Sequence, residues 1–245
     1  MRKGFNFWVI LMLSIAVVAC NRDNKNGNGD ILPQFEEYIL SVEESGYSVN
    51  ITYQRMTNTE RSAALSHIDE LNYKHTFDEY ALEPMDVEAS ARMLVEECAS
   101  EEHMSEQAYS YNLDQVVILS RNDEVVCYES YIEVYTGGAH GGQSLIYECY
   151  DIATGQAYDF GYLMDGEWCD ALRQLIYERI VDMYGDEQLI ATAKDIYIPR
   201  SVKLTDSGLL LVYQPYEIAS FDAGILSVEL SDEELAALGV PLLWI

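Results

Sequence analysis

Alternating apolar and polar side chains predict β-strands over much of the chain. The alternation is clear at residues 47–53, and longer runs rich in valine, isoleucine and tyrosine follow at residues 109–120 and 124–135. A period of two is typical of strands with one buried face. The residues between the longer runs, Arg121-Asn122-Asp123, predict a hairpin turn. Further strands are expected at residues 143–150 and 156–160, on either side of a Thr154-Gly155 turn, and at residues 201–204, 209–214 and 225–230.

Helical periodicity is limited to a few segments. Thr57-Asn58-Thr59-Glu60 has the form of a capping box and predicts the start of a short helix. Pro84 opens a second helical segment, because proline is favoured in the first turn of a helix. In that segment apolar or small side chains recur at helical spacing, at Val87, Ala91, Leu94 and Cys98.

The longest predicted helix runs from Asp165 to Gly185, a residue type that commonly terminates helices. Its apolar face is formed by Trp168, Leu172, Leu175, Ile176, Ile180 and Met183. Ser231 and Glu234 form another capping box, for a final short helix that closes at Gly239. Strands interrupted by isolated helices, without regular βαβ alternation, indicate an α+β fold. We expect mostly antiparallel sheets, with the long amphipathic helix packed on the C-terminal sheet.

The chain is predicted to divide into two folded parts. We expect an N-terminal α+β subdomain at residues 35–114 and a C-terminal α+β domain at residues 115–245. Residues 135–143 hold four glycines and mark another candidate boundary. Packing could also merge the two parts into one unit.

The N-terminus has the order of a secretory signal. Arg2 and Lys3 precede an apolar run at residues 5–19, which is shorter than the roughly 20 apolar residues of a membrane-spanning helix. Val17-Val18-Ala19-Cys20 fits the bacterial lipobox, in which the cysteine receives the lipid. We therefore expect a cleaved signal peptide at residues 1–19 and a lipidated, flexible stalk at residues 20–34, rich in asparagine and glycine. The alternative is a buried core segment with an ordinary cysteine.

The composition is strongly acidic. The chain has 14 basic and 42 acidic residues, and removal of residues 1–19 would leave 12 basic residues and a net charge of −30. Such a field repels nucleic acid and attracts cationic proteins, at rates that fall with salt. The alternative is that the acidity serves only solubility.

Four cysteines remain besides Cys20, at Cys98, Cys127, Cys149 and Cys169. An even number outside the cytoplasm permits one or two disulfides, with three full pairings. Their spacing is not that of a C-x-x-C metal or redox motif. Buried free thiols that act as small apolar side chains are the alternative.

Two groups of residues carry a resemblance to a known family. The first is the turn Tyr135-Thr136-Gly137-Gly138-Ala139-His140-Gly141, and the second is the strand at residues 209–213 with the loop Pro215-Tyr216-Glu217-Ile218-Ala219 and Ala223-Gly224. Together with Tyr150-Asp151, Thr154-Gly155 and the long helix, they resemble the C-terminal domain of the RsiV-type anti-sigma factors. The preceding region resembles the smaller domain found in RsiV-type and PdaC-type proteins.

The resemblance implies an extracytoplasmic binding module, which in RsiV recognises lysozyme. A transmembrane helix and a sigma-binding segment do not precede the domain here, so the anti-sigma role is not carried over. The candidate partner-binding residues are Tyr135, Gly137, Gly138, His140 and Gly141 in the turn, and Tyr213, Pro215, Tyr216 and Glu217 in the loop. Two structural alternatives stay open: the glycines only make a strained hairpin, and Tyr216 packs under its loop.

Signatures of catalysis are weak. The sequence contains no G-x-S-x-G, H-E-x-x-H or Walker motif, and its four histidines are not at metal-ligand spacing. Thr76-Phe77-Asp78-Glu79 resembles the metal-binding start of polysaccharide deacetylases but lacks the following glycine and the paired histidines, so we interpret it as a coincidence. His67 and His103 are interpreted as helix-surface residues.

We conclude that the sequence is typical of a lipid-anchored binding protein of the bacterial cell envelope, periplasmic or surface-facing. It is expected to be no enzyme, to use no cofactor or metal, and to recognise a cationic protein such as a lysozyme-type muramidase, or a cell-wall ligand. The alternatives are a relative of peptidoglycan or polysaccharide hydrolases and deacetylases, and a structural envelope lipoprotein.

Overall fold

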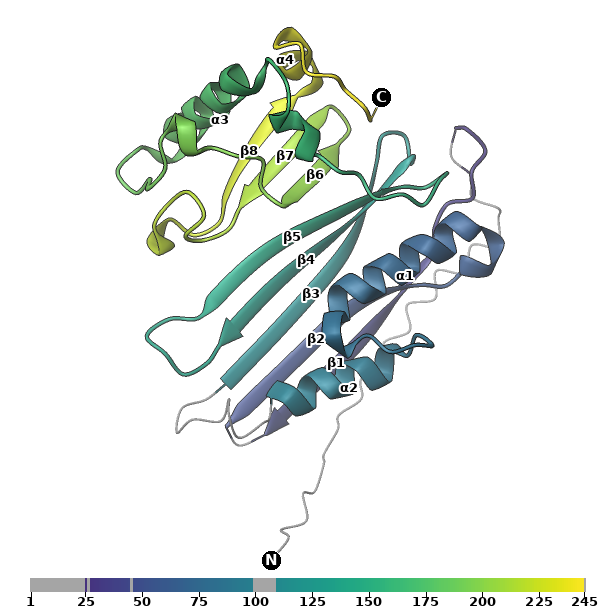
Figure 1. Cartoon of the computed structure of the whole chain (residues 1–245). Coiled ribbons are helices and arrows are strands. Elements are labelled where there is room, and N and C mark those ends of the chain that lie inside the picture. Colours follow the sequence, from purple (N-terminus) through teal and green to yellow (C-terminus); the bar gives the residue numbers. More distant parts are fainter. Residues whose placement is uncertain (1–24, 26, 45, 99–108, 245) are drawn as a thin grey trace, which may run out of the picture.

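The computed structural model describes residue 25 and residues 27–44, 46–98 and 109–244. Two sheets form the framework, one with the strand order β1-β2-β3-β4-β5 and one with the order β6-β7-β8 (Figure 1). The strands are β1 (Phe35–Glu44), β2 (Tyr47–Met56), β3 (Tyr109–Ser120), β4 (Val125–Tyr135), β5 (Gly142–Asp151), β6 (Ser201–Thr205), β7 (Gly208–Tyr213) and β8 (Leu226–Ser231). The α-helices are α1 (Ala63–Phe77), α2 (Val87–Cys98), α3 (Cys169–Tyr184) and α4 (Asp232–Ala237). The 3-10 helices are η1 (Thr59–Arg61), η2 (Asp78–Tyr80), η3 (Gly161–Met164), η4 (Ala193–Asp195) and η5 (Phe221–Ala223).

The pairing confirms the α+β class with mostly antiparallel sheets. Every pair of neighbouring strands is antiparallel except β2 and β3, which are parallel. A parallel pair needs a long crossover connection. Here the connection between β2 and β3 contains α1 and α2, which lie on one face of the five-stranded sheet (Figure 1).

The core follows these layers. One apolar cluster lies between the five-stranded sheet and helices α1 and α2, and it includes Ile51, Tyr53 and Phe77. The larger cluster joins α3 to the three-stranded sheet and reaches β4 and β5. In α3 the fully buried face consists of Leu172, Ile176 and Ile180, which confirms the amphipathic helix on the C-terminal sheet. Met183, expected on that face, is instead 58% exposed.

Several local predictions need correction. β1 was not expected, although Tyr38, Leu40 and Val42 alternate along it, because its four glutamates obscure the pattern. The capping box at residues 57–60 does not form, although the short 3-10 helix η1 does begin there, at Thr59. Helix α1 begins instead after Ser62, whose hydroxyl accepts a hydrogen bond from the backbone N–H of Leu65.

The predicted strand at residues 156–160 is reduced to a single bridge between Tyr150 and Ala157. Hydrogen bonds from Asp151 N to Gln156 O and from Tyr158 N to Cys149 O hold this short return against the end of β5. The chain then enters η3, so the strand cannot continue.

The predicted boundary between the two folded parts falls within one continuous sheet. The boundary between residues 114 and 115 falls inside β3, and the five-stranded sheet contains strands from both sides of it. At the other limit, Ile31 and Leu32 of the predicted stalk pack against the cluster around Tyr128. Asn58 also fixes this segment, by accepting from Gln34 N and donating to Leu32 O. The folded part of the chain therefore begins before residue 35.

Among the described residues, Cys127 and Cys149 form a disulfide. The two cysteines lie directly opposite each other on β4 and β5, with their Cα atoms 4.0 Å apart. Cys169 carries a free thiol. Cys20, with the expected signal peptide, and His103 lie outside the described residues, and the side chain of Cys98 is not described either.

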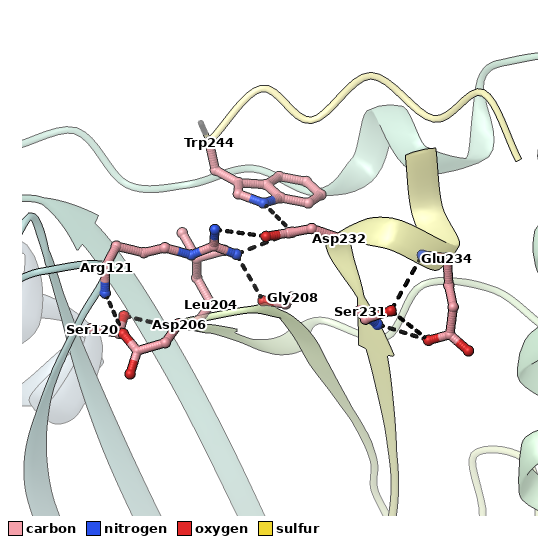
Figure 2. A network of polar contacts seen from close by, with 9 residues as sticks. All are labelled: Ser120, Arg121, Leu204, Asp206, Gly208, Ser231, Asp232, Glu234 and Trp244. Carbon is pink, nitrogen blue, oxygen red and sulfur yellow. Dashed lines mark hydrogen bonds and ion pairs between the residues drawn. The ribbon is translucent and has the colours of Figure 1, made fainter. Parts of the chain in front are cut away.

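A polar network fixes the β3–β4 hairpin to the C-terminal sheet (Figure 2). Arg121 forms a bidentate ion pair with Asp232, with Nη1 to Oδ2 at 2.7 Å and Nη2 to Oδ1 at 3.1 Å. Trp244 Nε1 donates to the same carboxylate at 2.9 Å, and Ser120 Oγ donates to the backbone oxygen of Leu204. The predicted capping box of Ser231 and Glu234 is confirmed beside this network. These contacts set how the two sheets meet.

Candidate functional site

The turn around His140 links β4 to β5 and is closed by its own side chains. Tyr135 Oη donates to the backbone oxygen of Gly138 at 3.1 Å. Gly137 has a φ of 83°, which favours glycine, and a Cβ atom at Gly141 would lie 2.8 Å from the backbone oxygen of Val134. These two glycines therefore make the turn, as the structural alternative proposed. The turn leaves the side chain of His140 exposed.

The loop after β7 is a tight turn with a proline at its second position. Gln214 O accepts from Glu217 N at 3.1 Å, and the carboxylate of Glu217 accepts from Gln214 N at 2.7 Å. Tyr216, the third residue, has a φ of 72°. Glycine or asparagine is the usual residue at this position, so tyrosine stores backbone strain here. Tyr216 is 61% exposed, so its side chain does not pack under the loop.

Tyr213 belongs to the core and not to the candidate surface. Its side chain is fully buried, and its hydroxyl donates to the backbone oxygen of Tyr197 at 2.7 Å. Burial raises the pKa of Tyr213, which keeps the hydroxyl protonated for this bond. Tyr213 supports the loop from below, and Glu217 closes it, which leaves Tyr216 as the projecting side chain.

Phe221 joins the two motifs. Its ring stacks on His140, with ring centroids 4.0 Å apart and planes at 26°, and it contacts Tyr216 with centroids 5.5 Å apart. Phe221 opens the 3-10 helix η5 in the connection between β7 and β8. The turn and the loop, which are 70 to 80 residues apart in sequence, thus form one surface. We call His140, Tyr216 and Phe221 the ring stack.

Acidic residues lie close in sequence to the members of the ring stack. Asp222 follows Phe221 directly, and Glu133 lies on β4 close to the His140 turn; both are exposed. His140 Nδ1 lies 3.3 Å from the backbone oxygen of Gly141, which can only accept, so Nδ1 carries a proton. An exposed aromatic centre with a carboxylate rim is suited to contact a cationic surface.

Phe221 was not predicted as a site residue because it lies outside the sequence motifs. The quoted loop motif ends at residue 219 and resumes at residue 223, and Phe221 lies in the gap. An aromatic residue in the connection between two predicted strands, three residues before Gly224, was the available signal.

The fold and the ring stack define a class, an α+β protein that presents aromatic side chains from loops between strands. Residues 164–233, which include α3, the Tyr216 loop and Phe221, match the family model described as "Protein of unknown function (DUF3298)". The His140 turn lies outside that match. Comparison with the curated proteins found no match to this chain.

The solved structures with a similar fold include two of DUF3298 family members. One is of a member of the DUF3298 family from Bacteroides fragilis, with a TM-score of 0.64 and 14% identity, covering 87% of this chain and 94% of that chain. The other is of a DUF3298 family protein from Pseudomonas aeruginosa, with a TM-score of 0.58 and 18% identity at the same coverages. At these identities the likeness is one of fold.

The described residues lack two other kinds of site. No three His, Cys, Asp or Glu side chains in that part of the chain lie together as a metal site would require. Among the described helices, none is long and apolar enough to span a membrane.

Proposed function

We propose that the protein is a lipid-anchored binding protein of the bacterial cell envelope that recognises a cationic protein, such as a lysozyme-type muramidase, through the ring stack. The observation that carries the proposal is the contact of Phe221 with both His140 and Tyr216, which makes one exposed aromatic surface from two separate motifs. The resemblance of both motifs to the RsiV-type domain supports the choice of partner.

Strain and charge add to this support. A tyrosine at a φ of 72° costs more than glycine would, and strained residues gather at functional sites. The net charge of −28 would steer a basic partner toward the surface. Charge would accelerate the encounter, whereas the aromatic contact, once desolvated, would set the lifetime of the complex.

The anchoring part of the proposal predicts the fate of a Cys20→Ala variant. Because Cys20 would receive the lipid, the variant should remain an unprocessed or soluble precursor. Fractionation of cells and mass spectrometry of the N-terminus measure this outcome. A variant that is still fully processed and membrane-bound would refute lipid attachment at Cys20.

The binding part predicts that Phe221→Ala and Tyr216→Ala each weaken binding of a muramidase by about 2 kcal/mol, or roughly thirtyfold in Kd. The loss should lie in the off-rate. Removal of a rim charge, in Asp222→Asn, should instead lower the on-rate and its dependence on salt. Surface plasmon resonance of the full-length protein against a panel of lysozyme-type muramidases measures both rates.

Matched controls separate a specific contact from a change in folding or general charge attraction. Leu243→Ala removes an apolar side chain that is 69% exposed and lies near Glu124 and Asp151, at the opposite end of β4 and β5 from the His140 turn, so it should bind as the parent does. Each variant must melt at the parent's temperature before its rates are compared. Cytochrome c, a basic protein without muramidase activity, should bind weakly and be insensitive to Phe221→Ala. The proposal fails if no muramidase binds, or if folded ring-stack variants bind like Leu243→Ala.

A further inference from the structure

A cleft separates helix α1 from the neighbouring strands β5 and β6. It consists of a cavity of about 490 Å³ and an adjoining one of about 320 Å³. Both are lined by the same three polar side chains, His75 at the end of α1, Glu148 on β5 and Arg200 just before β6. A volume of this order is typical of small-molecule sites in proteins.

The three side chains form a connected chain of contacts. His75 Nδ1 contacts Glu148 Oε1, and the other carboxylate oxygen of Glu148 accepts from Tyr150 Oη at 2.9 Å. Arg200 Nη2 lies 3.2 Å from His75 Nε2. Arginine can only donate, so Nε2 must be unprotonated and the imidazole is neutral, with its proton on Nδ1. Burial and the guanidinium of Arg200 lower the pKa of His75, in agreement with this state, although Asp78 opposes the shift.

Arg200 therefore keeps its positive charge without a carboxylate partner. The side chain is exposed, and among the ion pairs of the described residues none involves it. In a chain with three times as many acidic as basic residues, an arginine bound only to a neutral imidazole is unusual. The oxygens of Glu148 contact His75 Nδ1 and Tyr150 Oη, and Glu148 forms no ion pair with Arg200 among the described residues. Most of the donors of Arg200 are free for an anion.

The larger cavity offers an apolar wall beside this charge. Tyr158 and Phe160 lie in its lining with their rings stacked at 17° and 6.3 Å between centroids. Ile198 and Pro199, immediately before Arg200, extend the apolar lining. Asp159 lies between the two rings in sequence, but its carboxylate accepts from the backbone N–H of Gly161 at 2.8 Å.

We propose that this cleft binds a small organic carboxylate, whose anionic group meets the guanidinium of Arg200 and whose body lies against the aromatic wall of the larger cavity. Guanidinium groups recognise carboxylates through paired, charge-assisted hydrogen bonds. The site contains none of the ring-stack residues, so a test of carboxylate binding is independent of a test of the proposed protein partner.

Saturation-transfer NMR on the full-length protein tests the site with two kinds of carboxylate. Phenylacetate represents a ligand with an aromatic body, and glucuronate represents a sugar acid. The neutral counterparts are phenylacetamide and glucose. Ionic strength is kept near 0.15 M, where the screening length of about 8 Å suppresses repulsion from distant acids more than it weakens a direct contact.

We expect at least one carboxylate to bind with a Kd on the order of 1 mM, as its small size allows, and at least about tenfold more tightly than its neutral counterpart. Binding of phenylacetate alone would assign an aromatic or apolar acid, and binding of glucuronate alone a sugar acid. Arg200→Gln should raise the Kd for that carboxylate by about tenfold or more. Lys194→Gln makes the same charge change at an exposed residue of η4 outside the cleft and should have no effect.

The proposal is overturned if neither carboxylate binds at about 10 mM, ten times the expected Kd, or if the neutral counterparts bind equally well. It is also overturned if Arg200→Gln and Lys194→Gln behave alike. Because Arg200 is exposed, its replacement should leave the fold intact, and a melting curve checks this. Phe221→Ala should bind the carboxylate as the parent does, which separates this result from the test of the ring stack.

Discussion

Arg121→Met is expected to lower the free energy of unfolding by about 3 kcal/mol at neutral pH. The substitution keeps the length of the side chain but removes the charge that pairs with Asp232. The side chains of Arg121 and Asp232 are only 13% and 20% exposed, so the carboxylate would remain partly buried without its partner. The loss is larger than for a surface pair because desolvation of the remaining charge is not compensated. Denaturation by urea measures the change.

The same pair should make stability depend on acid. Burial alone would raise the pKa of Asp232, but the hydrogen bonds from Arg121 and Trp244 outweigh it and lower the pKa below its ordinary value of 3.8. A lowered pKa in the folded state means that the contribution is complete above pH 3.8 and is lost as the pH falls through the folded-state value. The free energies of unfolding of Arg121→Met and the parent should therefore differ most above pH 4, and this difference should shrink at lower pH.

An exposed ion pair provides the matched control. Arg92 and Glu88 pair on the surface of α2, with side chains that are 42% and 59% exposed. Arg92→Met should cost no more than about 0.5 kcal/mol. A double-mutant cycle with Asp232→Asn isolates the pairwise energy of Arg121 and Asp232. Equal losses for Arg121→Met and Arg92→Met would show that the network in Figure 2 does not hold the two sheets together.

Sequence patterns correctly predicted the elements that depend on residues close together in the chain. The β3–β4 hairpin, the three C-terminal strands and the capping box of Ser231 and Glu234 are all found where the sequence placed them. Each depends on side-chain alternation or on contacts within a few residues. The capping sequence at residues 57–60 leads only to the short 3-10 helix η1, and Ser62 is the residue that caps α1.

Long-range pairing was beyond the reach of such patterns. The parallel contact of β2 with β3 joins residues about 60 positions apart, and periodicity does not reveal which strands become neighbours. The same holds for the sites. Both candidate motifs were found from the sequence, but Phe221 as their link, and the meeting of His75, Glu148 and Arg200, depend on how the elements pack.

Asp69 is the clearest example of a buried charge that the sequence did not indicate. It lies on the inner face of α1 with 5% of its surface exposed, and its carboxylate accepts from the backbone N–H of Met56 at 3.2 Å. Burial raises its pKa from 3.8 to about 6, although the bond from Met56 and the charge of Arg55 oppose the shift. The folded chain therefore holds this proton more tightly than the unfolded chain does, so ionisation of Asp69 destabilises the fold.

Asp69→Asn should consequently stabilise the protein at pH 8 by about 3 kcal/mol, the energy that corresponds to a pKa rise from 3.8 to about 6. The amide keeps an oxygen for the bond from Met56 but carries no charge. With a folded pKa above the unfolded one, the favourable contribution of protonated Asp69 is complete below pH 3.8 and is lost as the pH rises through about 6. The variant and the parent should therefore have similar stability near pH 4 and diverge between pH 4 and 7.

Urea denaturation across this range measures the difference in free energy of unfolding. Asp182→Asn, on the exposed side of α3, is the control whose stability should stay parallel to that of the parent. A gap between Asp69→Asn and the parent that does not grow with pH would mean that Asp69 is ionised in the fold at little cost, with its charge stabilised by groups other than Met56.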